Sequence, residues 1–506
     1  MGPIRAKIVS VFFLALSLAL FAFDLDGDNP FLKINPDGSI TYIPDEKGNT
    51  IPDFSRVGYH QGDQKFPHIS IVKRIKPAPA GDSGGLIQSA IDQVGQLKPD
   101  HNGYRGTILL EKGTFLVNGV IKINAGGIVL RGTGDNAEGT KIVATGKVQR
   151  NLIEVSGTGA LKTASSPENI VDDFVPVGAF SFHITHAERF KVGDQILVYR
   201  PATAEWISAI KMDQIDAREG TLQWKPESYN LRYERKITKI KGNEIFIDNP
   251  IVMQMEKQFG GGKVMKYTFA SRISEVGIEQ LLLESSFESE TDEQHGWIAI
   301  DFAKAENCWV DQVTSRYFGF GCVNIASTAK CITVNNAKCF DAKSIITGSR
   351  RYSFNIDGQQ NLIMNCQSRQ ARHDYATGAF VCGPNVFCQG TAVKSKSDIG
   401  PHHRWATGTL YDNIRSDGLI DVEDRGNYGT GHGWAGVTQV LWNCTGSKIA
   451  VQSPWTSGKN YSIGTKGEKA TGRFKNRPDG EWFAHNQDAV PQSLYLAQLA
   501  ARQKIK

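Results

Sequence analysis

Short apolar runs, separated by turns rich in glycine and asparagine, recur through most of this chain. Residues 106–110 (Gly-Thr-Ile-Leu-Leu), 113–117 (Gly-Thr-Phe-Leu-Val) and 330–334 (Lys-Cys-Ile-Thr-Val) are examples. Runs this short predict β-strands, because the apolar periodicity of a helix extends over ten residues or more. The chain is therefore predicted to be all-β.

Helical spacing occurs in two places. Apolar residues at 86, 87, 90, 91 and 94 predict one helix, with Asp82 or Ser83 as its N-cap. Residues 493–502 predict a second, amphipathic helix that could cover the C-terminal end of the fold. Both are expected to have structural roles.

The later strands recur at nearly regular intervals. Their starts are separated by 23, 31, 24, 24 and 30 residues. Such a repeat predicts a solenoid of coils, in which the longer intervals carry loops on one side. The aligned starts are Asn307, Lys330, Asn361, Asn385, Thr409 and Gln439.

One phrase occurs three times in the most repetitive part, 361–446. Residues 373–378 are His-Asp-Tyr-Ala-Thr-Gly, residues 403–408 are His-Arg-Trp-Ala-Thr-Gly, and residues 432–436 are His-Gly-Trp-Ala-Gly. In a solenoid, one repeat position forms one column. We therefore expect three histidines and three aromatic rings to lie along a single face.

The first coils also resemble a known family. The residues that carry the resemblance are Gly81-Asp82, Ile-Gln-Ser-Ala-Ile-Asp at 87–92, Gly-Thr-Phe at 113–115 and Val-Leu-Arg-Gly-Thr-Gly at 129–134. They resemble the pectate-lyase-like, right-handed parallel β-helix superfamily, well over 81–150 and more loosely over 270–465. The resemblance implies a right-handed parallel β-helix with an N-terminal capping helix. It leaves the reaction open, since the superfamily includes lyases, hydrolases, epimerases and phage tailspikes.

These patterns predict six segments. They are a signal peptide (1–23), an extended arm (24–80), the start of the β-helix with its capping helix (81–154), an inserted β subdomain (155–270), the coils that carry the active-site loops (271–465), and a C-terminal tail with a helix (466–506). The insertion is predicted because 155–270 loses the coil rhythm, and 235–240 and 244–247 look like an antiparallel pair.

The chain is expected to be secreted. Arg5 and Lys7 precede an apolar run over 8–23, which is short for a membrane span and typical of a secretory signal. A retained N-terminal anchor is the alternative, and no other stretch is apolar enough to cross a bilayer. The eight cysteines, all between 308 and 444, would be disulfides or buried thiols. The expected location is extracellular or periplasmic, and the protein is expected to be a monomer.

The charge balance limits the classes of binding partner that are expected. Lysine plus arginine total 57 and aspartate plus glutamate 52, a net charge of +5 without a basic tract. Nucleic acid is therefore not predicted as a partner. The loops of three consecutive coils (368–375, 394–405 and 421–434) nevertheless gather four histidines and four arginines, and His295 could lie near the same column. Such a set of cations favours an acidic polysaccharide as the substrate.

β-Elimination at a uronic acid would use these residue types. Arginine neutralises the carboxylate, a base removes the C5 proton, and an acid protonates the departing O4. The expected catalytic residues are His403 as base, Tyr375 as acid, and Arg404, His373 and His432 in supporting roles. The expected substrate-binding residues are Arg372, His402, Arg425, Lys394, and Trp405 and Trp434 as stacking platforms.

Several alternatives remain open. The repeated His and aromatic positions could form an inward structural ladder, and Lys394 could simply be solvated. Asp421 and Asp424 could be the acid and base of a polygalacturonase-like hydrolase, because residues 431–433 (Gly-His-Gly) resemble one of that family's motifs, although its other motifs are missing. A uronate epimerase or a non-catalytic, carbohydrate-binding adhesin would also suit the pattern.

No metal or other cofactor is predicted. Four aspartates could ligate Ca²⁺, but no loop spacing supports it, and turn roles are favoured. They are Asp341, Asp357, Asp398 and Asp412.

Overall fold

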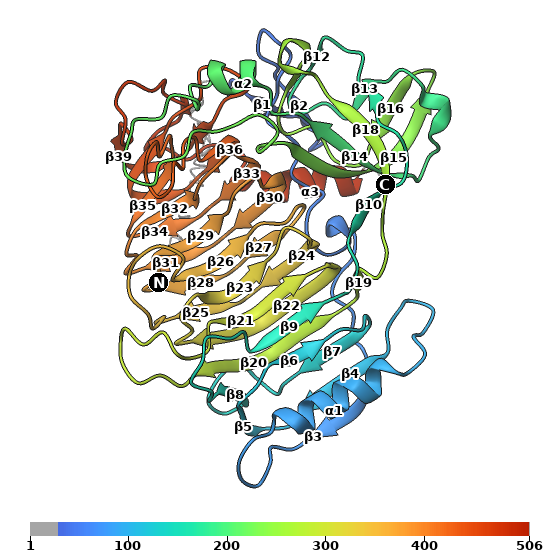
Figure 1. The fold of residues 1–506 in the computed structure, drawn as a ribbon, viewed down its shortest axis with the longest axis vertical. Helices are drawn as coiled ribbons and strands as arrows, with labels where there is room; N and C mark the ends of the chain where they lie inside the picture. The colour runs from blue at the N-terminus through green and yellow to red at the C-terminus, as the bar shows by residue number, and fades with distance from the viewer. Residues whose placement is uncertain (1–28, 505–506) are drawn as a thin grey trace, which may run out of the picture.

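The computed structural model describes residues 29–504, whose arrangement is shown in Figure 1. The expected signal peptide lies outside the described residues. Parallel strands stack on one another to form an elongated solenoid, and an antiparallel sheet lies beside the C-terminal coils (Figure 1). No described helix is both long enough and apolar enough to span a membrane.

The solenoid is a parallel β-helix with three columns of strands, which confirms the predicted fold class. Each strand pairs in parallel with the equivalent strand of the next coil. The first column contains β3 (Ile71–Ile75), β4 (Gly106–Leu110), β7 (Ile128–Arg131), β20 (Gly277–Ser285), β22 (Ala305–Arg316), β24 (Lys330–Asn335), β27 (Leu362–Met364), β30 (Cys382–Cys388), β33 (Ala406–Asp412), β36 (Gly436–Trp442), β38 (Tyr461–Ile463) and β40 (Glu481–Phe483).

The other two columns complete each coil. The second contains β5 (Gly113–Val117), β8 (Thr140–Ala144), the later halves of β20 and β22, β25 (Lys338–Phe340), β28 (Gln367–Arg369), β31 (Thr391–Val393), β34 (Arg415–Ser416) and the starts of β37 (Thr445–Val451) and β39 (Lys466–Ala470). The third contains β6 (Ile121–Ile123), β9 (Ile153–Ser156), β21 (Ile298–Ala303), β23 (Gly321–Ile325), β26 (Tyr352–Ile356), β29 (His373–Thr377), β32 (Asp398–Pro401), β35 (Leu419–Val422) and the ends of β37 and β39.

The interior of the coils is apolar and is held in register at the corners. Phe387 stacks on Tyr411 of the next coil at 5.1 Å. At one corner, Asn385 Oδ1 accepts the backbone N–H of Asn361 at 2.8 Å, so an amide side chain replaces a missing backbone acceptor. The eight cysteines are buried free thiols.

Helix α1 (Gly84–Gly95) covers the first coils, as predicted, and buries Ile87, Ile91 and Val94 against them. Helix α3 (Leu494–Lys504) lies elsewhere than expected. Instead of closing the C-terminal end, it packs Leu494 and Tyr495 against the outer surface of the first column.

Part of the expected arm belongs to the solenoid. Strand β3 pairs in parallel with β4, so residues 71–75 form the first rung of the first column. Upstream, β1 (Leu32–Ile34) and β2 (Ile40–Tyr42) form an antiparallel hairpin whose apolar residues join the cluster around α3. A 3₁₀ turn, η1 (Tyr59–Gly62), follows them.

An antiparallel subdomain lies between β9 and β19 (Ile273–Ser274). Its predicted pair is present as β15 (Leu231–Lys241) and β16 (Glu244–Ile247). The remaining elements are β10 (Leu161–Thr163), β11 (Glu168–Asn169), β12 (Phe174–Val175), β13 (Ser181–His183), η2 (Ala187–Arg189), β14 (Gln195–Arg200), α2 (Ala204–Ala209), β17 (Met255–Glu256), η3 (Lys257–Phe259) and β18 (Lys263–Phe269).

Candidate functional site

Four imidazole rings meet beside the C-terminal coils. His373 begins β29, His402 and His403 follow β32, and His432 lies in the loop before β36. The ring of His402 is central, with centroid distances of 4.4 Å to His373, 5.0 Å to His403 and 5.3 Å to His432. The rings of His403 and His432 are 4.9 Å apart.

The cluster has a buried layer and a partly exposed layer. His373 and His402 are only 1% and 7% exposed. His403 and His432 are partly exposed, as are Arg372 and Arg404. Only the second group is therefore accessible to a large ligand in this structure.

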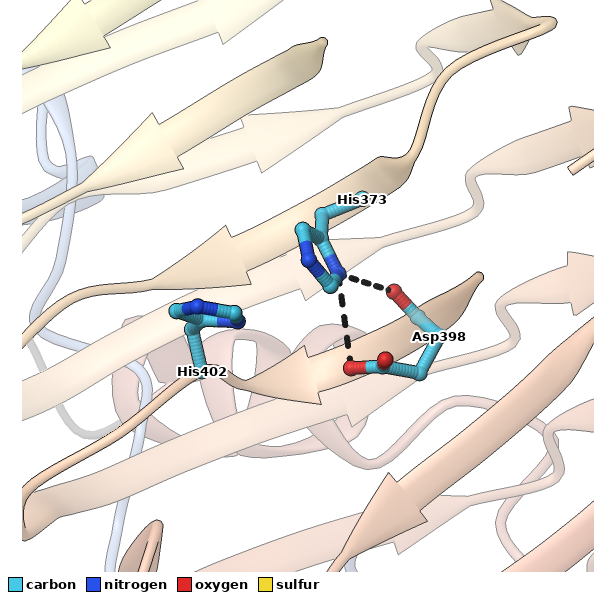
Figure 2. A group of neighbouring side chains, drawn as sticks. All are labelled: His373, Asp398 and His402. Atoms are coloured by element: carbon cyan, nitrogen blue, oxygen red, sulfur yellow. Dashed lines mark hydrogen bonds and ion pairs between the residues drawn. The ribbon is translucent and has the colours of Figure 1, made fainter. Parts of the chain in front are cut away.

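Asp398 organises the buried layer (Figure 2). Its Oδ2 and Oδ1 accept hydrogen bonds from the two terminal nitrogens of Arg425 at 2.7 and 3.2 Å. The backbone carbonyl of Asp398 accepts the Nδ1–H of His373 at 2.9 Å, and Oδ2 lies 3.3 Å from the same nitrogen. These contacts place the His373 proton on Nδ1 and leave Nε2 without a hydrogen-bond partner in the described part of the chain.

Two more carboxylates and one more arginine extend this layer. Arg473 comes from the C-terminal tail and lies 3.0 Å from Glu423 Oε1 and 3.5 Å from Asp421 Oδ2. Asp421 is fully buried, and Arg425 lies 3.6 Å from its Oδ1. The charged groups here are three carboxylates (Asp398, Asp421 and Glu423) and two guanidiniums.

Burial and the neighbouring charges shift several pKa values in the cluster. Burial, reinforced by Arg404 and Arg425, lowers the pKa of His403 to about 4. Burial and the neighbouring His403 and Arg425 lower the pKa of His432 to about 3. His373 and Arg425 overcome burial and hold the pKa of Asp398 well below its usual range. Burial next to Asp398 and Glu423 raises the pKa of Asp421.

Two arginines at the cluster have no carboxylate partner among residues 29–504. Arg372 donates from Nη1 to the hydroxyl of Tyr352 at 3.4 Å, and Arg404 donates from Nη2 to Thr430 Oγ1. Arg425 and Arg473, in contrast, are neutralised by acidic side chains. The charges of Arg372 and Arg404 are therefore available to an anionic ligand.

Tyr375 is wrongly predicted as the acid. It is 1% exposed, and its ring stacks inside the coils on Phe354. The hydroxyl donates to the backbone carbonyls of Cys366 and Thr391 at 2.7 and 3.0 Å. It is a core residue that cannot reach a substrate.

Trp405 and Trp434 are also wrongly predicted, as stacking platforms. Both are fully buried in the cluster that joins the inserted subdomain to the coils. The indole of Trp405 contacts Trp206 edge-on at 4.9 Å, and the indole N–H of Trp434 donates to the carbonyl of Ile210 at 3.2 Å. The repeated aromatic positions therefore anchor the subdomain.

Arg425 and Lys394 are not placed to bind substrate either. Arg425 is 4% exposed and paired with Asp398. Lys394 is exposed just after β31 in the second column, where its backbone N–H donates to Asp417. It takes no part in the imidazole cluster.

The three repeated phrases do not form one column. The second and third phrases pair with each other through Ala406 and Gly436, at the entry to the first column. The first phrase forms β29 in the third column, where Thr377 pairs with Pro401. The histidines still meet, because the chain turns the corner between these columns at His402 and His403.

Sequence reasoning missed three residues of the site. Tyr352 packs its ring 4.8 Å from His373 and 5.4 Å from His402. The sequence indicated Asp398 only as a possible Ca²⁺ ligand and assigned no role to Arg473. Coil spacing could have placed Tyr352, because it pairs with His373 in the neighbouring strand. No local motif marks Arg473.

One group of residues in the described chain has the composition of a metal site. Potential ligand atoms of His373, Asp398 and His402 lie within 4.8 Å of one another. The other weighed aspartates lie elsewhere. Asp341 pairs with Arg369, and Asp412 accepts hydrogen bonds from Ser493 and Tyr495.

No protein-family model and no curated protein matches the sequence. Solved structures with a similar course of the chain include ORF18 of Geobacillus virus E2, with 12% identity over 80% of this chain and 56% of that one and a TM-score of 0.37. The alginate lyase of Paenibacillus sp. str. FPU-7 has 9% identity over 82% of this chain and 99% of that one, with a TM-score of 0.39. The tailspike of E. coli bacteriophage HK620, solved with a pentasaccharide, has 8% identity over 78% of this chain and 55% of that one, with a TM-score of 0.39. These likenesses concern the fold alone.

Proposed function

We propose that this protein binds an acidic polysaccharide at the imidazole cluster and cleaves it by β-elimination. The observation that carries the proposal is the position of Arg372 and Arg404. Both are partly exposed, both lack a carboxylate partner among the described residues, and both flank partly exposed imidazoles. Cations held beside candidate bases favour a substrate that carries its own carboxylate.

The proposed reaction assigns one task to each group. Arg372 and Arg404 bind the carboxylate of a uronic acid, which makes the C5 proton more acidic. His403 removes that proton, and the C5–H electron pair forms the C4–C5 double bond. The C4–O4 bond breaks, and the leaving oxygen takes up a proton. The products are an unsaturated uronate and a new chain end.

Tyr352 replaces Tyr375 as the proposed proton donor. Its side chain is 7% exposed, so its hydroxyl must become accessible beside the partly exposed Arg372 when the polymer binds. Its hydroxyl lies 3.4 Å from Arg372 Nη1, and its ring contacts the imidazole cluster directly. The ring of Phe320 stacks on the ring of Tyr352, with the two centroids 5.0 Å apart. His432, the partly exposed imidazole nearest to His403, is proposed to position the substrate.

The buried carboxylates disfavour the hydrolase alternative. Asp421 and Asp424 are both fully buried, and Asp424 Oδ2 accepts a hydrogen bond from Arg477 at 2.6 Å. A glycosidase needs two carboxyl groups flanking the scissile bond. Neither of these can reach a polymer from its present position.

The test is incubation with a panel of uronate polymers while the ultraviolet absorbance of an unsaturated product is monitored. We expect at least one polymer to produce this absorbance together with new chain ends. New reducing ends without the absorbance would indicate hydrolysis instead. Binding without either signal would contradict elimination and support a binding protein.

A further inference from the structure

The buried layer beneath the proposed substrate site has a geometry that the elimination reaction does not require. His373, Asp398 and His402 converge on one point, as Figure 2 shows. Two imidazoles and one carboxylate form a ligand set that is typical of zinc and other first-row transition metals.

The hydrogen bonds leave one donor atom on His373 free for an ion. Nδ1–H is donated to the backbone carbonyl of Asp398, so the lone pair lies on Nε2. Metal-binding histidines commonly donate their other ring N–H to a carbonyl or carboxylate in this way. Nε2 of His373 and Nδ1 of His402 are both buried without a hydrogen-bond partner in the described chain.

Asp398 also retains one free acceptor position. An ionised carboxylate accepts about four hydrogen bonds. Oδ1 accepts two, from Arg425 at 3.2 Å and from Ser397 at 2.8 Å, while Oδ2 accepts one, from Arg425 at 2.7 Å. The remaining lone pair belongs to Oδ2, the oxygen that lies 3.3 Å from His373 Nδ1. Arg425 thus fixes the carboxylate without saturating it.

The buried layer also contains other acidic side chains near Asp398. Asp398, Asp421 and Glu423 are opposed by Arg425 and Arg473 alone within the buried layer. Both oxygens of Asp421 are buried without a hydrogen-bond partner in the described residues.

We infer that His373, His402 and Asp398 bind one divalent transition-metal ion through one ring nitrogen of each histidine and a carboxylate oxygen of Asp398. Zinc ligands lie about 2.0–2.2 Å from the ion, and therefore roughly 3.5 Å from one another. One candidate ligand atom from each residue lies within 4.8 Å of the others here, so the three side chains move closer together when the ion binds. A fourth position stays open to water or an anion.

This inference does not depend on the proposed elimination. The ion would fix the ring of His402 and, through the chain, the adjacent His403. The metal experiment needs no substrate, so its result is independent of the result of the lyase assay.

The experiment is calorimetric titration of chelator-treated full-length protein with Zn²⁺, followed by Co²⁺ substitution and visible spectroscopy. We expect one ion per chain and ligand-field absorption bands from bound Co²⁺. His373→Ala and His402→Ala should each weaken Zn²⁺ binding at least tenfold, with circular dichroism confirming the fold. Asp398→Asn, which keeps the side-chain shape beside Arg425, should weaken it as well.

Two controls test the location of the ion. His101→Ala, at an exposed position on the N-terminal coils, should leave Zn²⁺ binding unchanged. His432→Ala should also retain one ion per chain, because His432 is outside the group of three. Equal loss in the His432 variant, or no bound ion in the wild-type protein at millimolar Zn²⁺, would overturn the inference.

Discussion

At the scale of single residues, exposure divides the candidate site more sharply than residue type does. Four histidines lie in contact, yet only His403 and His432 are accessible to a polymer. Two buried tyrosines of similar chemistry have different neighbours, Tyr375 the interior of the coils and Tyr352 the imidazoles. Their substitution therefore separates catalytic from structural roles.

Tyr352→Phe should lower kcat by roughly 100-fold or more, the usual contribution of a proton donor, with little change in stability. Tyr375→Phe should leave kcat unchanged. It should cost about 1–3 kcal/mol of unfolding free energy, because the buried hydrogen bonding of the hydroxyl to the carbonyls of Cys366 and Thr391 is lost. Steady-state kinetics and urea denaturation of both variants check this pair, and the reverse pattern would return the acid role to Tyr375.

The two unpaired arginines should contribute separately to binding. Arg372→Ala and Arg404→Ala should each lower kcat/KM for an acidic polymer by about 10- to 100-fold, since a charged hydrogen bond contributes about 1.5–3 kcal/mol. Arg74→Ala, an exposed arginine on β3 at the other end of the solenoid, is the matched control and should have no effect. Unchanged kinetics in both cluster variants would mean that the carboxylate binds elsewhere.

At the scale of elements, a buried carboxylate joins helix α3 to the solenoid. Asp412, the last residue of β33, accepts hydrogen bonds from Ser493 Oγ and from the backbone N–H of Tyr495, both at 2.7 Å. Burial raises the pKa of Asp412 to about 6. Because this value lies above that of the unfolded chain, the folded state binds more protons between about pH 4 and pH 6.

The contribution of Asp412 to stability should therefore be present below about pH 4 and be lost as the pH rises through about 6. Its full size is on the order of 3 kcal/mol. Asp412→Asn cannot titrate, so the difference in unfolding free energy between variant and wild type should change across this range and be constant above it. Denaturant titrations at intervals from pH 4.5 to 7.5 measure this, and a pH-independent difference would contradict the assignment.

At the scale of the whole molecule, the repeated aromatic positions join two bodies. Trp405 and Trp434 come from the coils and pack against Trp206 and Ile210 of the inserted subdomain. The junction between the inserted subdomain and the coils therefore depends on residues that were predicted from the sequence to stack on sugars.

Trp405→Phe should destabilise the protein by about 1–3 kcal/mol, because it removes buried volume and the indole contact with Met253 Sδ at 3.0 Å. KM should change less than twofold. Unfolding followed by circular dichroism and by tryptophan fluorescence should remain one coincident transition. A raised KM with unchanged stability would instead indicate a sugar-stacking role.

Strand spacing was sufficient to predict the solenoid, since parallel coils repeat the same apolar strand at each turn. Asn361 and Asn385, two of the aligned positions, lie at the same corner of successive coils and are joined by a hydrogen bond. The direction of each side chain was not predictable from spacing. The first phrase entered the third column, while the second and third phrases, at nearly the same spacing, entered the first. Asp398 and Arg473 were missed as site residues because only the folded chain brings them together.

The central claim is that the imidazole cluster removes a proton from a uronate held by Arg372 and Arg404. The most direct measurement is the ultraviolet absorbance of the unsaturated product, recorded for wild type and His403→Ala with the polymer that responds. The wild type should produce it, and the variant should lose at least 100-fold in rate while keeping its fold and its affinity for the polymer. Full activity of a correctly folded His403→Ala variant would contradict the account.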